Sequence, residues 1–552
     1  MPRSMRGPAL GALGAALLLL ALAPMPARAA LAGPSPAAAS ARLAASAPLA
    51  QASASFYWQR GTDRAQQGDY RGAIDDFTHA LNLLHSVDRT RADLYVARGW
   101  AYANSGDPRA AIADFERALR FNSELADAYL GRGAARAALN DYQGAIADFT
   151  RALQINPANA DAYSSRANAR AALGDQLGAI ADFTLALAAN PRAASAYTGR
   201  AWARAKLGDR QGALEDFSLA LAVDPTNTDA YSGRAGLRAE LNDPRGAIED
   251  YTAALQWQPN DAGLYVGRGW ARATLGDHAG ALQDFTAALA LRPDTLDARL
   301  GLASARAALG DHQGAIAEFT RALALDPTNA DAYSSRGQAR AALGDAAGAI
   351  ADYTAALQQR PNDAGLYVGR GWARAALGDA AGAVADFTTA LQLAPDQSDA
   401  YSGRASARAA LGDTAGAIAD YTHLLALRPD DADAYNGRAR ARAAAGDDTG
   451  AIADYTAALQ QRPDDVGAYL GRGFARATLG DHQGAWADFS AALTLDPASA
   501  DAYGGRAWAR AALGDTEGAV ADLQQAAALY QAQGDQAGYQ QAIEGLQQLT
   551  AP

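Results

Sequence analysis

The sequence contains no cysteine, and its three methionines, at positions 1, 5 and 25, all lie near the amino terminus. Without cysteine the chain cannot form disulfides, carry a lipid on a lipoprotein cysteine or bind a metal through thiolates. Lysine is almost as scarce, because Lys206 is the only lysine among 48 basic residues. A Walker phosphate-binding loop needs Gly-Lys-Ser/Thr, and Lys206 is followed by Leu207, so that motif is excluded.

Groups that carry catalysis or hold metals are also scarce. The six histidines include no pair at the helical spacing of metal ligands, and no serine combines with histidine and aspartate at a definable spacing. The glycine-rich stretch YVGRGWARATLGD, residues 265–277, recurs with one change at residues 367–379. A dinucleotide-binding loop would need a third glycine where Arg272 stands, and a preceding strand. We therefore predict a protein that is not an enzyme and has no cofactor or metal.

The chain has fewer basic residues than acidic ones, 48 against 60. The chain has a formal net charge of -12, and removal of the arginines at 3, 6 and 28 with a cleaved leader would make it -15. Because nucleic-acid binding depends on basic residues that neutralise phosphates, we expect no nucleic-acid partner.

The amino terminus has the features of an export signal. Arg3 and Arg6 precede an apolar run at residues 9–23 and the small-residue triplet Ala-Arg-Ala at 27–29. Because the run is short for a bilayer span, we expect a signal peptide at 1–29, cleaved near Ala29, and a bacterial protein exported to the periplasm or beyond. An uncleaved anchor is the alternative. Residues 30–53, rich in Ala, Pro and Ser, are expected to form a flexible spacer.

From residue 54 to residue 533 the sequence repeats with a period of 34 residues, interrupted only by four extra residues at 88–91. This makes fourteen copies, and we number positions 1 to 34 within each. The copies begin at Ala54, Ala92, Ala126, Ala160, Ala194, Thr228, Ala262, Leu296, Ala330, Ala364, Ser398, Ala432, Val466 and Ala500.

Each copy is predicted to form two antiparallel helices, A and B. Positions 4, 8 and 11, and then 20, 24 and 27, keep their residue types at helical spacing. Position 15 is Gly or Asn, which ends helix A, position 16 is always Asp, which caps helix B, and Pro at position 32 follows helix B in eleven copies. Residues 534–552 contain an amphipathic segment that is expected to cap the array.

The repeat resembles the tetratricopeptide repeat, with an aromatic at position 4, Gly or Ala at 8, Ala at 20, Phe or Tyr at 24, Ala at 27 and Pro at 32. The resemblance covers about 480 residues. It implies an all-α, right-handed superhelical solenoid of antiparallel helix hairpins, whose concave groove is lined by A helices and binds peptides or proteins. Arg at positions 7 and 11 departs from the family. The family's clamp for acidic chaperone tails needs Lys at position 5, and no copy has one.

Arg at position 7 recurs together with Asp at position 23, on facing sides of the hairpin. We predict structural ion pairs within most copies, for example Arg132 with Asp148, Arg268 with Asp284, and Arg370 with Asp386. The eighth copy instead has Leu302 and Glu318, with an arginine at position 4, Arg299, so its bridge should be absent or rebuilt from one turn away. The alternative is an arginine array that binds an anionic ligand.

Positions 2, 5, 9 and 12 form the helix A face that would line the groove. Rings at position 9 and aliphatic residues at position 5 are the candidate partner-binding residues. They are Val96, Trp100, Trp202, Val266, Trp270, Val368, Trp372, Leu470, Phe474 and Trp508. Three of these pairs recur every 102 residues, which indicates duplication of a three-copy block. Either the rings dock apolar side chains of a partner, or they pack against the adjacent copy.

Together these features predict a scaffold that binds a protein or peptide partner, with assembly of an envelope or membrane complex as its role. Evenly spaced rings also suit stacking on sugars, so a polysaccharide-binding scaffold of an export or cell-surface system stays an alternative.

Overall fold

The computed structural model describes residues 49–84 and 89–550, which form 29 helices and no strand. The predicted signal peptide at 1–29 and most of the predicted spacer lie outside the described residues. Helix α3 begins at Leu49, so residues 49–53 of the predicted spacer are helical. The sequence LAQAS before the first copy contains helix formers and no Gly or Pro, so the helix extends upstream. No described helix combines the length and hydrophobicity that a bilayer span requires.

The helices alternate as A and B helices of fourteen hairpins. The A helices are α3 (Leu49–Gln66), α5 (Arg89–Asn104), α7 (Ala126–Ala138), α9 (Ala160–Ala172), α11 (Ala194–Lys206), α13 (Thr228–Glu240), α15 (Ala262–Thr274), α17 (Leu296–Ala308), α19 (Ala330–Ala342), α21 (Ala364–Ala376), α23 (Ser398–Ala410), α25 (Ala432–Ala444), α27 (Val466–Thr478) and α29 (Ala500–Ala512). The B helices are α4 (Tyr70–Leu83), α6 (Pro108–Phe121), α8 (Tyr142–Ile155), α10 (Gln176–Ala189), α12 (Arg210–Val223), α14 (Pro244–Trp257), α16 (His278–Leu291), α18 (His312–Leu325), α20 (Ala346–Gln359), α22 (Ala380–Leu393), α24 (Thr414–Leu427), α26 (Asp448–Gln461), α28 (His482–Leu495) and α30 (Thr516–Gln533).

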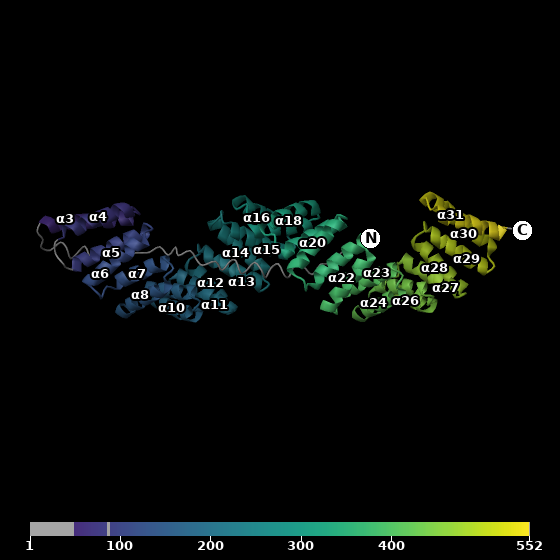
Figure 1. Cartoon of the computed structure of the whole chain (residues 1–552), viewed down its shortest axis with the longest axis horizontal. Helices are drawn as coiled ribbons and strands as arrows, with labels where there is room; N and C mark the ends of the chain where they lie inside the picture. Colours follow the sequence, from purple (N-terminus) through teal and green to yellow (C-terminus); the bar gives the residue numbers. More distant parts are fainter. Residues whose placement is uncertain (1–48, 85–88, 551–552) are drawn as a thin grey trace. The chain divides into compact units, whose positions relative to one another are not determined.

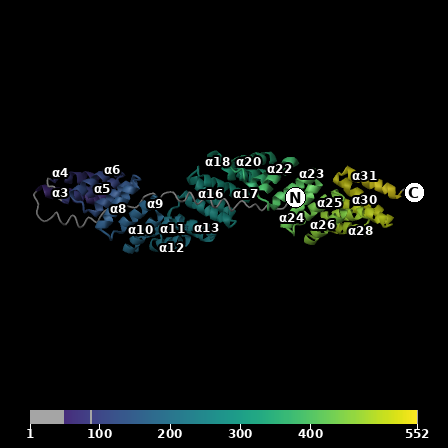
Figure 2. The ribbon, with the colours of Figure 1, turned by 60° about the horizontal axis from the view of Figure 1, so that its bottom comes forward.

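The chain divides into two compact units, residues 1–301 and 302–552. Within each unit the two helices of a hairpin pack against each other and against the next hairpin, as Figures 1 and 2 show. This arrangement confirms the predicted all-α solenoid of helix hairpins. The right-handed superhelix stays a prediction.

The turn between helices A and B has the predicted conformation. Every described residue at position 15 has a positive φ, including the two that are not glycine, Asn140 at 63° and Asn242 at 62°. The aspartate that follows caps helix B, as when Asp277 accepts a hydrogen bond of 2.9 Å from the Gly280 amide. A left-handed residue followed by an N-cap reverses the chain within the turn.

Small residues on both helices let an aromatic ring fill the space between them. Phe285 at position 24 of the seventh copy is fully buried. A Cβ atom on Gly269 would lie 2.9 Å from Phe285, and one on Gly267 would lie 2.4 Å from Tyr251 of the preceding copy. The glycines of the YVGRGWARATLGD stretch are therefore packing positions, as predicted.

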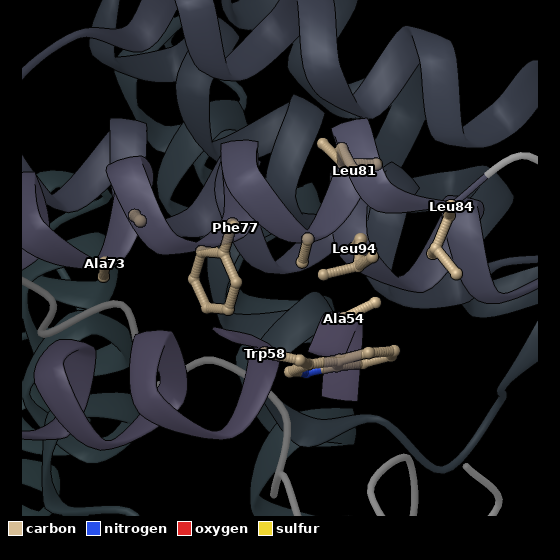
Figure 3. Close-up of a cluster of buried hydrophobic side chains, with 9 residues drawn as sticks. Ala54, Trp58, Ala73, Phe77, Leu81, Leu84 and Leu94 are labelled. Carbon is tan, nitrogen blue, oxygen red and sulfur yellow. The ribbon is translucent and has the colours of Figure 1, made fainter. Parts of the chain in front are cut away.

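The first hairpin shows how consecutive helices share one core. Trp58 of α3, Phe77 of α4 and Leu94 of α5 belong to a single buried cluster, and Figure 3 shows their side chains directed into the space between these helices. Each core thus takes side chains from two neighbouring copies, as expected because one hairpin cannot bury its apolar face alone.

The array ends in an additional helix, α31 (Gln536–Thr550), which packs on α30. Its apolar residues from Tyr539 to Leu549 lie against a buried cluster that includes Leu523. Helix α31 therefore covers the apolar surface that the fourteenth copy would otherwise expose.

Candidate functional site

The contact expected between positions 7 and 23 is present in thirteen copies. In the seventh copy the Arg268 side chain binds the Asp284 carboxylate through two bonds, Nη2 to Oδ1 at 2.7 Å and Nε to Oδ2 at 3.0 Å. The same paired contacts join Arg132 with Asp148, and Arg370 with Asp386. The carboxylate is buried at all of these positions, so the two-bond contact compensates for its loss of hydration.

Two further partners of this contact were missed from the sequence. Arg272 at position 11 places Nη1 2.9 Å from the second Asp284 oxygen, and Arg268 also donates to the Thr252 hydroxyl of the preceding copy at 3.2 Å. The equivalent hydrogen bond to Asp386 raises the pKa of Arg370. Because the arginines at positions 7 and 11 are committed to these groups, this geometry disfavours the alternative of an arginine array for an anionic ligand.

The eighth copy differs as its sequence requires. Leu302 is buried at position 7 and cannot bridge. Glu318 pairs with Arg321 of the same helix, one turn further on. Arg299 donates to the Pro293 carbonyl at 2.6 Å. Arg321, at position 26, therefore supplies a cation for Glu318 from outside the recurring positions.

The predicted row of groove residues is only partly exposed. Trp100 is 6% exposed, and the aliphatic residues Val96, Val266 and Val368 are likewise buried, so their assignment to an exposed groove is wrong. The physical reason is that position 5 lies where neighbouring copies meet. Val368, for example, shares a buried cluster with alanines of the next A helix.

Most of the rings pack inside their own hairpin. Trp202, Trp270, Trp372 and Leu470 are partly buried. The Trp270 ring meets Phe285 edge to face with centroids 5.2 Å apart, and its Nε1 is buried without an acceptor. The same arrangement joins the rings at positions 9 and 24 in four other copies, Trp100 with Phe115, Trp202 with Phe217, Trp372 with Phe387, and Phe474 with Phe489. This favours the packing interpretation for these tryptophans.

Two rings remain open to solvent, Phe474 at 48% and Trp508 at 47% exposure. The residue at position 5 of the following copy accounts for the difference between Phe474 and Trp100. Leu130 packs against the cluster that contains Trp100, whereas the copy after Phe474 offers only Gly504. Trp508 lies next to α31, where an added Cβ on Gly545 would come within 3.1 Å of its ring.

The described residues contain no group of three or more His, Cys, Asp or Glu placed to hold a metal ion. Arg440, at position 9 of the twelfth copy, and Trp257, at the end of α14, are among the exposed residues outside the predicted set. Arg440 was detectable from its place in the position 9 row. Trp257 lies outside helix A and gave no such signal.

No curated protein sequence is significantly similar to the chain. Among solved structures, the Cut9–Hcn1 hetero-tetramer of APC/C matches at 14% identity and a TM-score of 0.37, covering 86% of this chain and 99% of the matched chain. A tetratricopeptide repeat protein from Parabacteroides merdae matches at 19% identity and 0.35, covering 45% and 98%. YrrB, described as a TPR protein with an unusual peptide-binding site, matches at 22% identity and 0.30, covering 33% and 95%.

Three models of the tetratricopeptide repeat match the chain. One matches residues 92–125 and another residues 126–159. The third matches overlapping segments at 232–294, 266–330, 300–364, 334–398, 368–422 and 402–466. The matched segments together span more than half of the chain and lie on the helix hairpins described above. The chain therefore belongs to the tetratricopeptide-repeat family, whose stacked hairpins are scaffolds for protein–protein interaction.

Proposed function

We propose that the chain is an exported scaffold without catalytic activity, which binds a protein or peptide partner on the A-helix face of its last copies. The observation that carries the proposal is the exposure of Phe474 and Trp508 at the same position of consecutive A helices, where the other aromatic residues at position 9 are wholly or partly buried. Large exposed rings are enriched among the residues that dominate binding energy in interfaces.

Export rests on the sequence of residues 1–29. Two arginines, an apolar run and the triplet before residue 30 are the parts of a cleavable signal. The mature scaffold would then work in the periplasm or outside the cell, and we propose assembly of an envelope or membrane complex as its role. Amino-terminal sequencing of the exported protein should give a chain that begins at Ala30. A mature chain that keeps Met1 would contradict export by cleavage.

Polysaccharide binding is the second candidate, because Phe474 and Trp508 could each stack on a sugar ring. The two candidates differ in what competes for the rings. Apolar peptides should displace a protein partner, whereas oligosaccharides should saturably quench the fluorescence of Trp508 if the ligand is a glycan.

The test of partner binding is affinity capture from envelope extracts with three baits. These are the wild-type chain, the double variant Phe474→Ala/Trp508→Ala, and the control Trp257→Ala, which removes an exposed ring outside the row. We expect one defined protein to be lost from the double variant alone, with helicity unchanged. Identical captured proteins from all three baits would refute the assignment of these rings to the binding face.

A further inference from the structure

The site around Phe474 and Trp508 also contains a positive charge without a partner. Arg440 occupies position 9 of α25, the same position that carries the two rings in α27 and α29. It is exposed, and the described residues provide it with neither an ion pair nor a hydrogen bond. Its positive charge opposes the rise in the pKa of Tyr455 that burial causes. One copy further on, Phe474 packs edge to face on Phe489.

Arg440, Phe474 and Trp508 form a row on α25, α27 and α29, which are three consecutive A helices of one unit. Helix α25 packs against α27, and α27 packs against α29. The neighbouring positions 12 and 13 carry no charge, since they are alanines and Thr478. Helix α27 has no acidic residue in its first turn, because position 2 of that copy is Gly467. The row thus offers one cation and two apolar rings, separated by small uncharged side chains.

The acidic residues around the row are already engaged. Asp433 forms an ion pair with Arg462. Asp465 accepts hydrogen bonds from the Asn436 amide at 2.7 Å and from the Ala468 amide at 3.0 Å. Tyr530 donates a bond of 2.6 Å to Asp501. Because these carboxylates have partners of their own, Arg440 is free to bind a carboxylate supplied by a ligand.

We propose that Arg440, Phe474 and Trp508 together bind an extended peptide that carries one carboxylate followed by two apolar side chains. The inference rests on the proposed function and specifies its ligand. Packed helices lie about 8–10 Å apart, and an extended chain advances about 3.3–3.6 Å per residue. One repeat therefore corresponds to about three residues, so the apolar side chains should follow the acidic one after about three and about six residues.

Helix α31 limits the row at Trp508. Gly545 of α31 packs so closely on the Trp508 ring that an added Cβ would come within 3.1 Å of it, so α31 covers one part of the ring. The second apolar side chain of the ligand would pack on the part of the ring that stays exposed, with the carboxylate two repeats away at Arg440.

The experiment is calorimetric titration of the full chain with synthetic peptides of about twelve residues, long enough to span the row. The first peptide has glutamate followed by leucine at the third and phenylalanine at the sixth subsequent residue, in a Ser/Gly background. The second replaces glutamate by glutamine, and the third places both apolar residues directly after glutamate. We expect the first peptide to bind about tenfold more tightly than either of the others.

Matched variants assign the contacts. Arg440→Gln should remove the preference for glutamate over glutamine and leave the affinity for the glutamine peptide unchanged. Trp508→Ala should weaken the glutamate and glutamine peptides by about tenfold or more. The controls Arg245→Gln and Trp257→Ala, both exposed residues of α14 outside the row, should change neither affinity.

Equal binding of the glutamate and glutamine peptides, or a preference that survives in Arg440→Gln, would overturn the proposal. If Trp508→Ala still weakened binding in that case, the proposed function would stand and only the acidic specificity would fail. A further outcome is that no peptide binds, while the wild-type bait captures a protein that the double variant does not capture. In that case the ligand assignment would fail and the proposed function would stand. Failure of both experiments would refute the proposed function.

Discussion

At the scale of single residues, two recurring features of the copies are physically coupled, tyrosine at position 4 and arginine at position 7. The guanidinium of Arg268 at position 7 lies 5.6 Å from the ring centroid of Tyr265 at position 4, in addition to its bonds with Asp284. Both residues change together in the eighth copy, where Arg299 and Leu302 replace them. Tyrosine at position 4 and arginine at position 7 thus form one unit that holds the buried carboxylate from one side, while Arg272 holds it from the other.

Replacement of Asp284 by alanine should destabilise its hairpin strongly. The change leaves Arg268 and Arg272 without their shared carboxylate in a largely buried site, and breaking such a pair destabilises a protein by about 3–5 kcal/mol. Hydrogen exchange of α15 and α16 measures the effect locally. Asp294→Ala, which changes an exposed aspartate of the next loop, is the control. Equal loss of protection in both variants would contradict a stabilising role for the ion pair.

The first hairpin should become less stable in acid because of Asp76. Hydrogen bonding from Arg60 holds the pKa of Asp76 below its ordinary value. A depressed folded-state pKa means that the stabilisation is complete above the unfolded pKa of about 3.9 and is lost as pH falls through the folded value. The stability difference between wild type and Asp76→Asn, measured by hydrogen exchange of α3 and α4, should therefore shrink as pH falls below about 4. A difference independent of pH would refute this assignment.

At the scale of helices and hairpins, local signals were sufficient to predict the fold. The left-handed residue and the aspartate cap at positions 15 and 16 define each turn, and their recurrence at a fixed period gives hairpins that must stack. The start of α3 at Leu49 and the ion pair between Arg321 and Glu318 were not anticipated, because no copy-like sequence precedes residue 54 and position 26 lies outside the recurring positions. The exposure of the rings was not predictable either, because Trp100 and Phe474 occupy the same position in their copies. Their exposure depends on the following copy, which has Leu130 at position 5 next to the Trp100 cluster and Gly504 at position 5 after Phe474.

Removal of residues 534–552 should destabilise the end of the array first. The truncation exposes the apolar cluster around Leu523 and Ala526, which α31 covers in the full chain. Because each hairpin of a solenoid contacts only its neighbours, protection from hydrogen exchange should fall in α29 and α30 and stay unchanged in the first hairpins. Uniform loss of protection along the chain would contradict this local role of α31.

At the scale of the whole molecule, we expect the function to depend on the differences between copies. The positions that build the hairpin are nearly constant along the chain, whereas position 9 varies from copy to copy. Only a few of these variable residues are exposed enough to contact a partner, and the rings among them lie near the carboxyl end. Because the net charge is -12, we expect recognition to depend on local chemistry at Arg440, Phe474 and Trp508 rather than on long-range attraction of an anionic partner.

The most direct measurement is photo-crosslinking in living cells, with a photoreactive phenylalanine analogue at position 474 or, as a control, at position 56. Both native phenylalanines are exposed, at 48% and 59%, but Phe56 lies on the first helix, outside the proposed binding face. We predict that the variant with the photoreactive residue at position 474 forms one discrete covalent adduct with a partner, and that the variant with it at position 56 forms none. The same adduct from both positions, or no adduct from position 474, would contradict it.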